Sequence, residues 1–105
     1  MALIIQVEDQ LHRVLDEFRD TGGAFVRLCL RAARAGTGHW PVLATVDQYS
    51  DTRLNRIQQG LLLAELTAVQ AQPELLGDAG PVVRQVAEAA NRVYTDGGYL
   101  NIVGE

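Results

Sequence analysis

The sequence predicts a helix-rich α+β domain in which three or four helices cover a small sheet of two or three strands, the C-terminal strand among them. Apolar residues recur with the period of an amphipathic helix over several long segments. Short runs rich in β-branched residues stand near both ends of the chain. The 105 residues, 48% of them apolar, match the size and composition of a single domain spanning residues 1–105.

The first segment, residues 2–7, is expected to be a strand because it is mostly apolar and rich in β-branched residues. A helix is then expected from Glu8 to the glycine pair Gly22 and Gly23. Acidic residues suit its first turn, where the helix dipole is positive. Its apolar positions are spaced at i, i+3, i+4 and i+7: they are Leu11, Val14, Leu15 and Phe18. The acidic residues of this segment would lie on a solvated helix and not in a pocket: they are Glu8, Asp9, Asp16 and Glu17.

Residues 24–35 fit both a helical stripe and a strand alternation. We predict a helix because alanine and arginine, which favour helices, fill its second half. Residues 36–41 then form a loop, and residues 42–46 are expected to be a short strand entered at Pro41.

A polar turn over residues 47–52 leads into a helix that should stop near Pro73. The apolar positions of this helix are Leu54, Ile57, Leu61, Leu62, Leu66 and Val69. Gly60 within it indicates either a close contact or a bend. Pro81 suits the first turn of the last helix, and residues 99–103 alternate as a closing strand. We expect the two terminal strands to meet in one sheet.

The charge balance argues against several classes of function. The formal net charge is −4, and the nine basic residues are all arginines without a dense patch, which disfavours nucleic-acid binding. The single cysteine, Cys29, forms no internal disulfide and is expected to be a small buried hydrophobe. No apolar run approaches the roughly 20 residues of a membrane span, and no signal peptide is recognised. We therefore expect a cytoplasmic protein.

Residues 47–58 are the most informative segment for a site. Oxygen-bearing side chains stand at positions 1, 3, 5, 9 and 12 of this window, as in a calcium loop: Asp47, Tyr49, Asp51, Asn55 and Gln58. Thr52 replaces the glycine of such a loop, and Gln58 cannot supply a bidentate carboxylate. We therefore expect no metal and no other cofactor. Instead, Asp47 or Ser50 should form a side-chain turn, and Asp51 or Thr52 should cap the helix.

The same region supplies the candidate partner-binding residues. Tyrosine, tryptophan and arginine are enriched at binding hot spots, and Trp40 is either a plug over the core or an interface anchor. Arg56 is expected to pair with Asp47 or Asp51. The full candidate set is Trp40, Asp47, Tyr49, Asp51, Arg53, Asn55 and Arg56. No nucleophile, phosphate-loop or dinucleotide motif is present, so no catalytic residue is assigned and a non-enzymatic role is favoured.

The run PVLATVDQYSDTRLNRIQ over residues 41–58 resembles the pattern P-L-L-x-x-V-D-P-Y-x-D-T-x-F-N-R-x-Q of a family of small, functionally uncharacterised bacterial proteins that is frequent in actinomycetes. The segment over residues 61–66 and the ending LNIVGE also resemble this family, so the likeness covers about the last two thirds of the chain. Gln48 and Leu54 depart from its proline and its aromatic residue. The family implies no activity. The layout is also similar to that of immunity proteins of bacterial toxin systems, which implies a stoichiometric, acidic protein that acts by binding.

Three functions follow as hypotheses. The leading one is a protein-binding module, such as an immunity-like inhibitor of a basic partner protein. The second is a self-associating accessory or regulatory subunit, such as a homodimer, because so much of this small chain is apolar. The third is a small ligand-binding protein or enzyme that uses the loop over residues 47–55.

Overall fold

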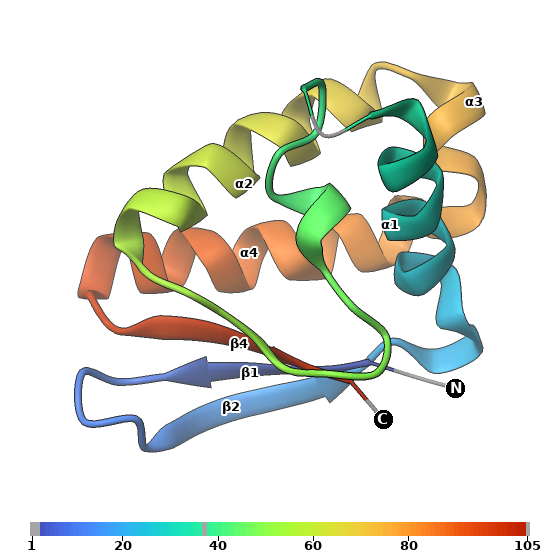
Figure 1. Ribbon diagram of the computed structural model, residues 1–105. Helices are drawn as coiled ribbons and strands as arrows, with labels where there is room; N and C mark the ends of the chain where they lie inside the picture. Colours follow the sequence, from blue (N-terminus) through green and yellow to red (C-terminus); the bar gives the residue numbers. More distant parts are fainter. Residues whose placement is uncertain (1–2, 37, 105) are drawn as a thin grey trace.

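The computed structural model describes residues 3–36 and 38–104, and it has the predicted α+β class with a larger sheet than expected (Figure 1). Four antiparallel strands lie in the order β2-β1-β4-β3, so the strands nearest the two ends of the chain pair at the centre, as predicted. The strands are β1 (Ile4–Glu8), β2 (Val14–Arg19), β3 (Thr52–Leu54) and β4 (Tyr99–Val103). The helices are α1 (Ala24–Ala35), α2 (Arg56–Gln70), the single turn α3 (Pro73–Leu76) and α4 (Gly80–Asp96).

The helices cover only one face of the sheet (Figure 1). Successive strand residues point to opposite faces, and the side chains that face the helices form the floor of the core: they are Ile5, Val7, Leu54, Leu100 and Ile102. Among the residues of the central strands that point to the other face, Gln6 and Tyr99 are half-buried, whereas Glu8 and Asn101 are buried. We call this uncovered side the open face of the sheet.

The helix predicted from Glu8 to the glycine pair is wrong, because this segment forms the β1–β2 hairpin. The Asp9 carboxylate closes the turn by accepting hydrogen bonds from the backbone N–H groups of Leu11 and Arg13, at 2.8 and 2.9 Å. His12 adopts a left-handed φ of 63° in this turn. The pairing register shifts between Val7 and Glu8, and this bulge interrupts the alternation by which a strand is recognised in a sequence.

The helix predicted over residues 24–35 is confirmed as α1. Its first turn is held by Asp20, whose two carboxylate oxygens each accept a hydrogen bond of 3.0 Å, from the backbone N–H groups of Phe25 and Val26. The glycine pair lies before α1, in a short 3₁₀ turn with positive φ. Cys29 is buried in α1 as expected, and burial raises the pKa of its thiol.

The strand predicted over residues 42–46 is wrong, because Leu43–Thr45 form a 3₁₀ turn. The backbone N–H groups of Val42 and Leu43 donate hydrogen bonds of 3.0–3.2 Å to the buried carboxylate of Glu65 on α2. These donors therefore cannot bond to a neighbouring strand. Residues Thr52–Leu54, which were expected to lie in the turn and the start of the following helix, form the short edge strand β3 instead.

The predictions for the two longest helices are confirmed, with one change at the start of α2. Asn55 caps α2 in a reciprocal capping box with Gln58, whereas either Asp51 or Thr52 was expected to be the cap. Gly60 makes a close contact, since a Cβ there would lie 3.2 Å from the ring of Tyr94 on α4. Among the residues that the structure describes, no helix combines the length and the apolar character needed to cross a membrane.

Candidate functional site

The loop that precedes β3 is organised by Asp47. One oxygen of its carboxylate accepts a hydrogen bond from the backbone N–H of Tyr49 (2.8 Å), and the other accepts one from the Ser50 hydroxyl (3.1 Å). The predicted side-chain turn is therefore confirmed. Because both oxygens serve the loop itself, the arrangement favours a structural role for Asp47 over ligand binding. Tyr49 is 68% exposed at the tip of the loop.

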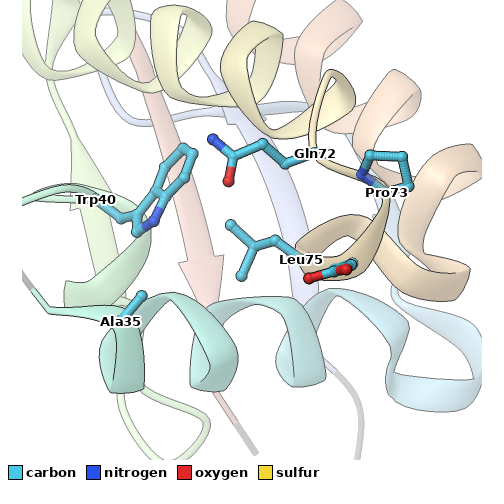
Figure 2. A pocket seen from close by; sticks show the side chains of 6 residues that line it. Ala35, Trp40, Gln72, Pro73 and Leu75 are labelled. Carbon is cyan, nitrogen blue, oxygen red and sulfur yellow. The ribbon is translucent and has the colours of Figure 1, made fainter.

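Three of the predicted partner-binding residues make contacts outside this loop. Trp40 is 6% exposed and closes the core beside a mostly apolar hollow of about 620 Å³, where its indole faces Leu75 and Gln72 (Figure 2). Arg56 lies over the ring of Tyr94, 5.2 Å from its centroid, instead of pairing with Asp47 or Asp51. Asn55 is used in the cap of α2. Trp40 therefore belongs to the core, whereas the partner-binding role of the other six candidate residues, all of them exposed, stays a prediction.

Arg53 leads to a different site, on the open face of the sheet. Its Nε donates a hydrogen bond to Oε1 of Glu8 at 3.1 Å, and Nδ1 of His12 lies 3.2 Å from the same oxygen. The Asn101 amide donates to the other oxygen of Glu8 at 3.4 Å. The Glu8 side chain is only 4% exposed although it lies on the open face, because these neighbours cover it.

The contacts continue across all four strands. The Asn101 amide also donates to Gln6 (3.4 Å), and the Gln6 amide donates to the Glu17 carboxylate (3.2 Å). The register explains this chain of contacts, since Arg53, Asn101, Gln6 and Glu17 lie directly opposite one another on successive strands. We call these four residues together with Glu8 the open-face row.

One end of the open-face row is covered by the β1–β2 turn. The His12 ring stacks on Tyr99 at a centroid distance of 4.4 Å, and its left-handed backbone places it over Glu8. This conformation is uncommon for a residue other than glycine, and the contacts with Glu8 and Tyr99 hold His12 in it. The end of the row is therefore preorganised by contacts from two different strands.

The charge state of Glu8 follows from these contacts. Burial raises the pKa of its carboxyl, but the hydrogen bonds from Arg53 and His12 outweigh that effect, and the net pKa is lowered. Glu8 is thus ionised at neutral pH and suited to accepting hydrogen bonds, whereas a general acid or base works best near the operating pH. Asn101 Oδ1 is buried and has no hydrogen-bond partner among the described residues.

We expect the Glu8 contacts to make folding stability fall in acid. The lowered pKa means that ionised Glu8 stabilises the fold above its ordinary value of 4.5, and this contribution is lost as the pH falls through the lowered value. Glu8→Gln should therefore be less stable than the wild type at neutral pH and less sensitive to acid. Urea unfolding at a series of pH values from about 6 to about 3 measures both effects.

The matched control for this prediction is Glu88→Gln, which changes an exposed glutamate on α4. Its unfolding free energy should follow the wild-type pH curve. If the curve of Glu8→Gln ran parallel to the wild-type curve, the contacts of Glu8 with Arg53 and His12 would contribute nothing to the stability of the folded state.

Sequence reasoning missed most of the open-face row. Glu8 and Glu17 were placed on a solvated helix, and this is wrong because Glu8 is buried and both lie on strands. Two signals were present in the sequence. Gln6 and Asn101 each stand between apolar neighbours inside a terminal strand, which is the alternation of a strand with one polar face.

Comparison of the chain with protein-family models, curated proteins and solved structures finds no match. The resemblance to a family of small bacterial proteins therefore stays a prediction. Together the fold and the site define an α+β domain whose sheet has one helix-covered face and one open, polar face. Among the described residues, no group of three or more histidine, cysteine, aspartate or glutamate side chains could hold a metal ion.

Proposed function

We propose that this chain is a non-enzymatic protein-binding module that docks a basic partner protein on the open face of its sheet, as an immunity-like inhibitor would, in the cytoplasm. The observation that supports this proposal most strongly is the open-face row. Its five side chains are fixed by one another on rigid strands. Polar groups that are already ordered lose little entropy when a partner binds them.

The charges of the open face support a basic partner. Glu8 and Glu17 provide two carboxylates on this face, and Asp51 adds an exposed carboxylate directly before β3. Arg19 and Arg53 lie on the same face, and Arg53 is already held by Glu8. Glu17 and Asp51 form no ion pair with the arginines of the described residues. With a net charge of −4, the chain should attract a positively charged protein surface and repel nucleic acid.

Capture from the cells that carry this gene tests the proposal. Tagged wild type is expected to retain a basic protein in a stoichiometric amount. The double variant Glu17→Gln, Asp51→Asn should lose this protein, because it removes the two carboxylates that remain to attract a cation. Retention should weaken as salt is raised, since exposed charges are screened within about 10 Å at 0.1 M salt.

The matched control is Glu74→Gln, Glu88→Gln, which removes two exposed carboxylates from the helical layer. It should retain the same protein as the wild type. If both double variants retained the same proteins in the same amounts, the open face would not be the binding surface. If the wild type retained no protein partner, the proposal of a binding module would be wrong.

A further inference from the structure

The outward side of α2 is a second surface with an unusual composition. Ile57 is 77% exposed and Leu61 is 51% exposed, and Tyr94 of α4 lies beside them with 41% of its surface exposed. The rest of this side consists of glycine, alanine and threonine. We call it the α2 outer face, and its residues are Ile57, Gly60, Leu61, Ala64, Thr67, Ala68 and Ala71.

The α2 outer face carries no charged side chain. Between Arg56 and Glu74 the only charged residue is Glu65, which points inward and binds the backbone of Val42 and Leu43. A surface helix ordinarily has a polar face turned to water, and α4 follows that rule with exposed Arg84 and Glu88. In Figure 1, α2 lies on the side of α4 remote from the sheet. Tyr94 of α4 contacts the outer face at Gly60, and the other six residues of this face are exposed.

We propose that the α2 outer face binds a second copy of this chain through an antiparallel pairing of the two α2 helices. Ile57, Leu61, Ala64 and Ala68 follow the alternating four- and three-residue spacing of a coiled-coil seam. Their order is self-complementary, because the two large residues come first and the two small ones follow.

A two-fold axis between Leu62 and Leu63 sets large residues against small ones throughout the pairing. It places Ile57 opposite Ala68 of the partner subunit. It also places Leu61 opposite Ala64 of the partner subunit, and the same axis serves both pairs. Such an isologous contact closes as a dimer and does not propagate. The small residues allow the two helix axes to approach to about 8 Å, the lower end of the range for packed helices.

The electrostatics of this pairing are favourable. Two copies with a net charge of −4 each repel one another over most approaches, but the α2 outer face brings no carboxylates together. The antiparallel arrangement sets the start of α2 and its Arg56 beside the end of the partner's α2. The unpaired carbonyls at a helix C-terminus carry partial negative charge, which a cation stabilises.

The size of the interface limits the affinity. A 15-residue helix is about 22 Å long, and a single helix pair of that length buries less than the standard interface of about 1,600 Å². We therefore expect a dimer with a dissociation constant of about 1–100 μM, which is the range of a weak but specific association.

Sedimentation equilibrium over a concentration series tests the proposed pairing. The wild type should fit a monomer–dimer equilibrium. Leu61→Lys and Ala64→Glu should each weaken dimerisation by at least about tenfold, because each buries charge that has no partner in its own homodimer. An equimolar mixture of the two variants should regain dimers, since the lysine introduced into one copy then faces the glutamate introduced into the other. The matched control is Leu11→Lys on the β1–β2 turn, where the leucine is 71% exposed, and it should dimerise like the wild type.

Three outcomes would overturn the proposal. In the first, the wild type stays monomeric at about 1 mM, well above the dissociation constants expected for a small specific interface. In the second, Leu61→Lys dimerises as tightly as the wild type. In the third, the mixture of Leu61→Lys and Ala64→Glu dimerises no better than either variant alone. Circular dichroism of each variant confirms that it is folded before it is compared. The α2 outer face and the open face share no residue, so capture of a partner by a monomeric variant would leave the proposed function intact.

Discussion

Gly98→Ala is expected to be the most damaging single substitution outside the helical core. Gly98 has a φ of 103° at the entrance to β4, and a Cβ there would overlap the carbonyl oxygen of Glu8. The substitution adds backbone strain of about 1–3 kcal/mol and a clash with backbone that cannot move aside, so we expect a total cost of at least about 4 kcal/mol. Urea unfolding followed by the fluorescence of the single tryptophan, Trp40, measures the loss.

Gly36→Ala is the matched control for this prediction. Gly36 has nearly the same φ, 107°, but a Cβ there meets nothing within 4 Å. It should therefore cost only the strain, about 1–3 kcal/mol. If the two variants were equally stable, the close approach of β4 to the end of β1 would not be real. The position of Glu8 in the open-face row would then also be in doubt.

Glu65→Ala is expected to cost about 3 kcal/mol. Glu65 is 7% exposed, and its carboxylate accepts three hydrogen bonds from the N–H groups of Val42 and Leu43. Removing it leaves two buried donors without an acceptor, at about 1–3 kcal/mol for each unsatisfied group. Glu65→Gln keeps one acceptor oxygen and should lose about half as much. Thermal and urea unfolding give both values.

The matched control is Glu88→Ala, which removes a glutamate from the exposed side of α4. Its effect should stay within about 0.5 kcal/mol, as for most surface substitutions. If Glu65→Ala were as mild as Glu88→Ala, the 3₁₀ turn at Leu43–Thr45 would be held by its own packing, and the contact from α2 would be incidental.

The elements that the sequence predicted correctly are those whose structure is set by their own residues. The second half of α1 is rich in alanine and arginine, two residue types with a high intrinsic preference for a helix. The helix α4 begins next to Pro81, and β4 alternates without interruption. Local preference and tertiary packing agree in these segments, and such agreement is what makes a segment predictable from one sequence.

The predictions were wrong where the backbone conformation is determined by side-chain contacts or by contacts with residues distant in the sequence. The spacing of Leu11, Val14, Leu15 and Phe18 matches a helix, yet only Phe18 packs against the core. The hairpin is determined by the hydrogen bonds of Asp9 and by the bulge, in which β2 has one extra residue opposite Val7 and Glu8. Neither feature produces a periodic pattern of apolar residues in the sequence. The amides of Val42 and Leu43 are bound by a residue more than twenty positions away. A sequence pattern contains no information about that pairing.

The candidate site was predictable only in part. Arg53 was identified for its residue type and does belong to the open-face row. Its partner Glu8 lies 45 positions away, and Asn101 lies 93 positions from Glu8. These residues meet because β1 and β4 pair at the centre of the sheet, and the placement of Glu8 depended on recognising the hairpin. The mistaken helix therefore concealed the site.

The central claim is that the open face of the sheet is the binding surface, and side-chain amide resonances test it most directly. The partner captured by the wild type is titrated into isotope-labelled protein. We expect the amide signals of Gln6 and Asn101 to shift first, because both lie in the middle of the open-face row. If these two signals stayed unchanged while that of Gln72, beside the Trp40 hollow, shifted on addition of the partner, the binding surface would lie on the helical layer and the claim would be wrong.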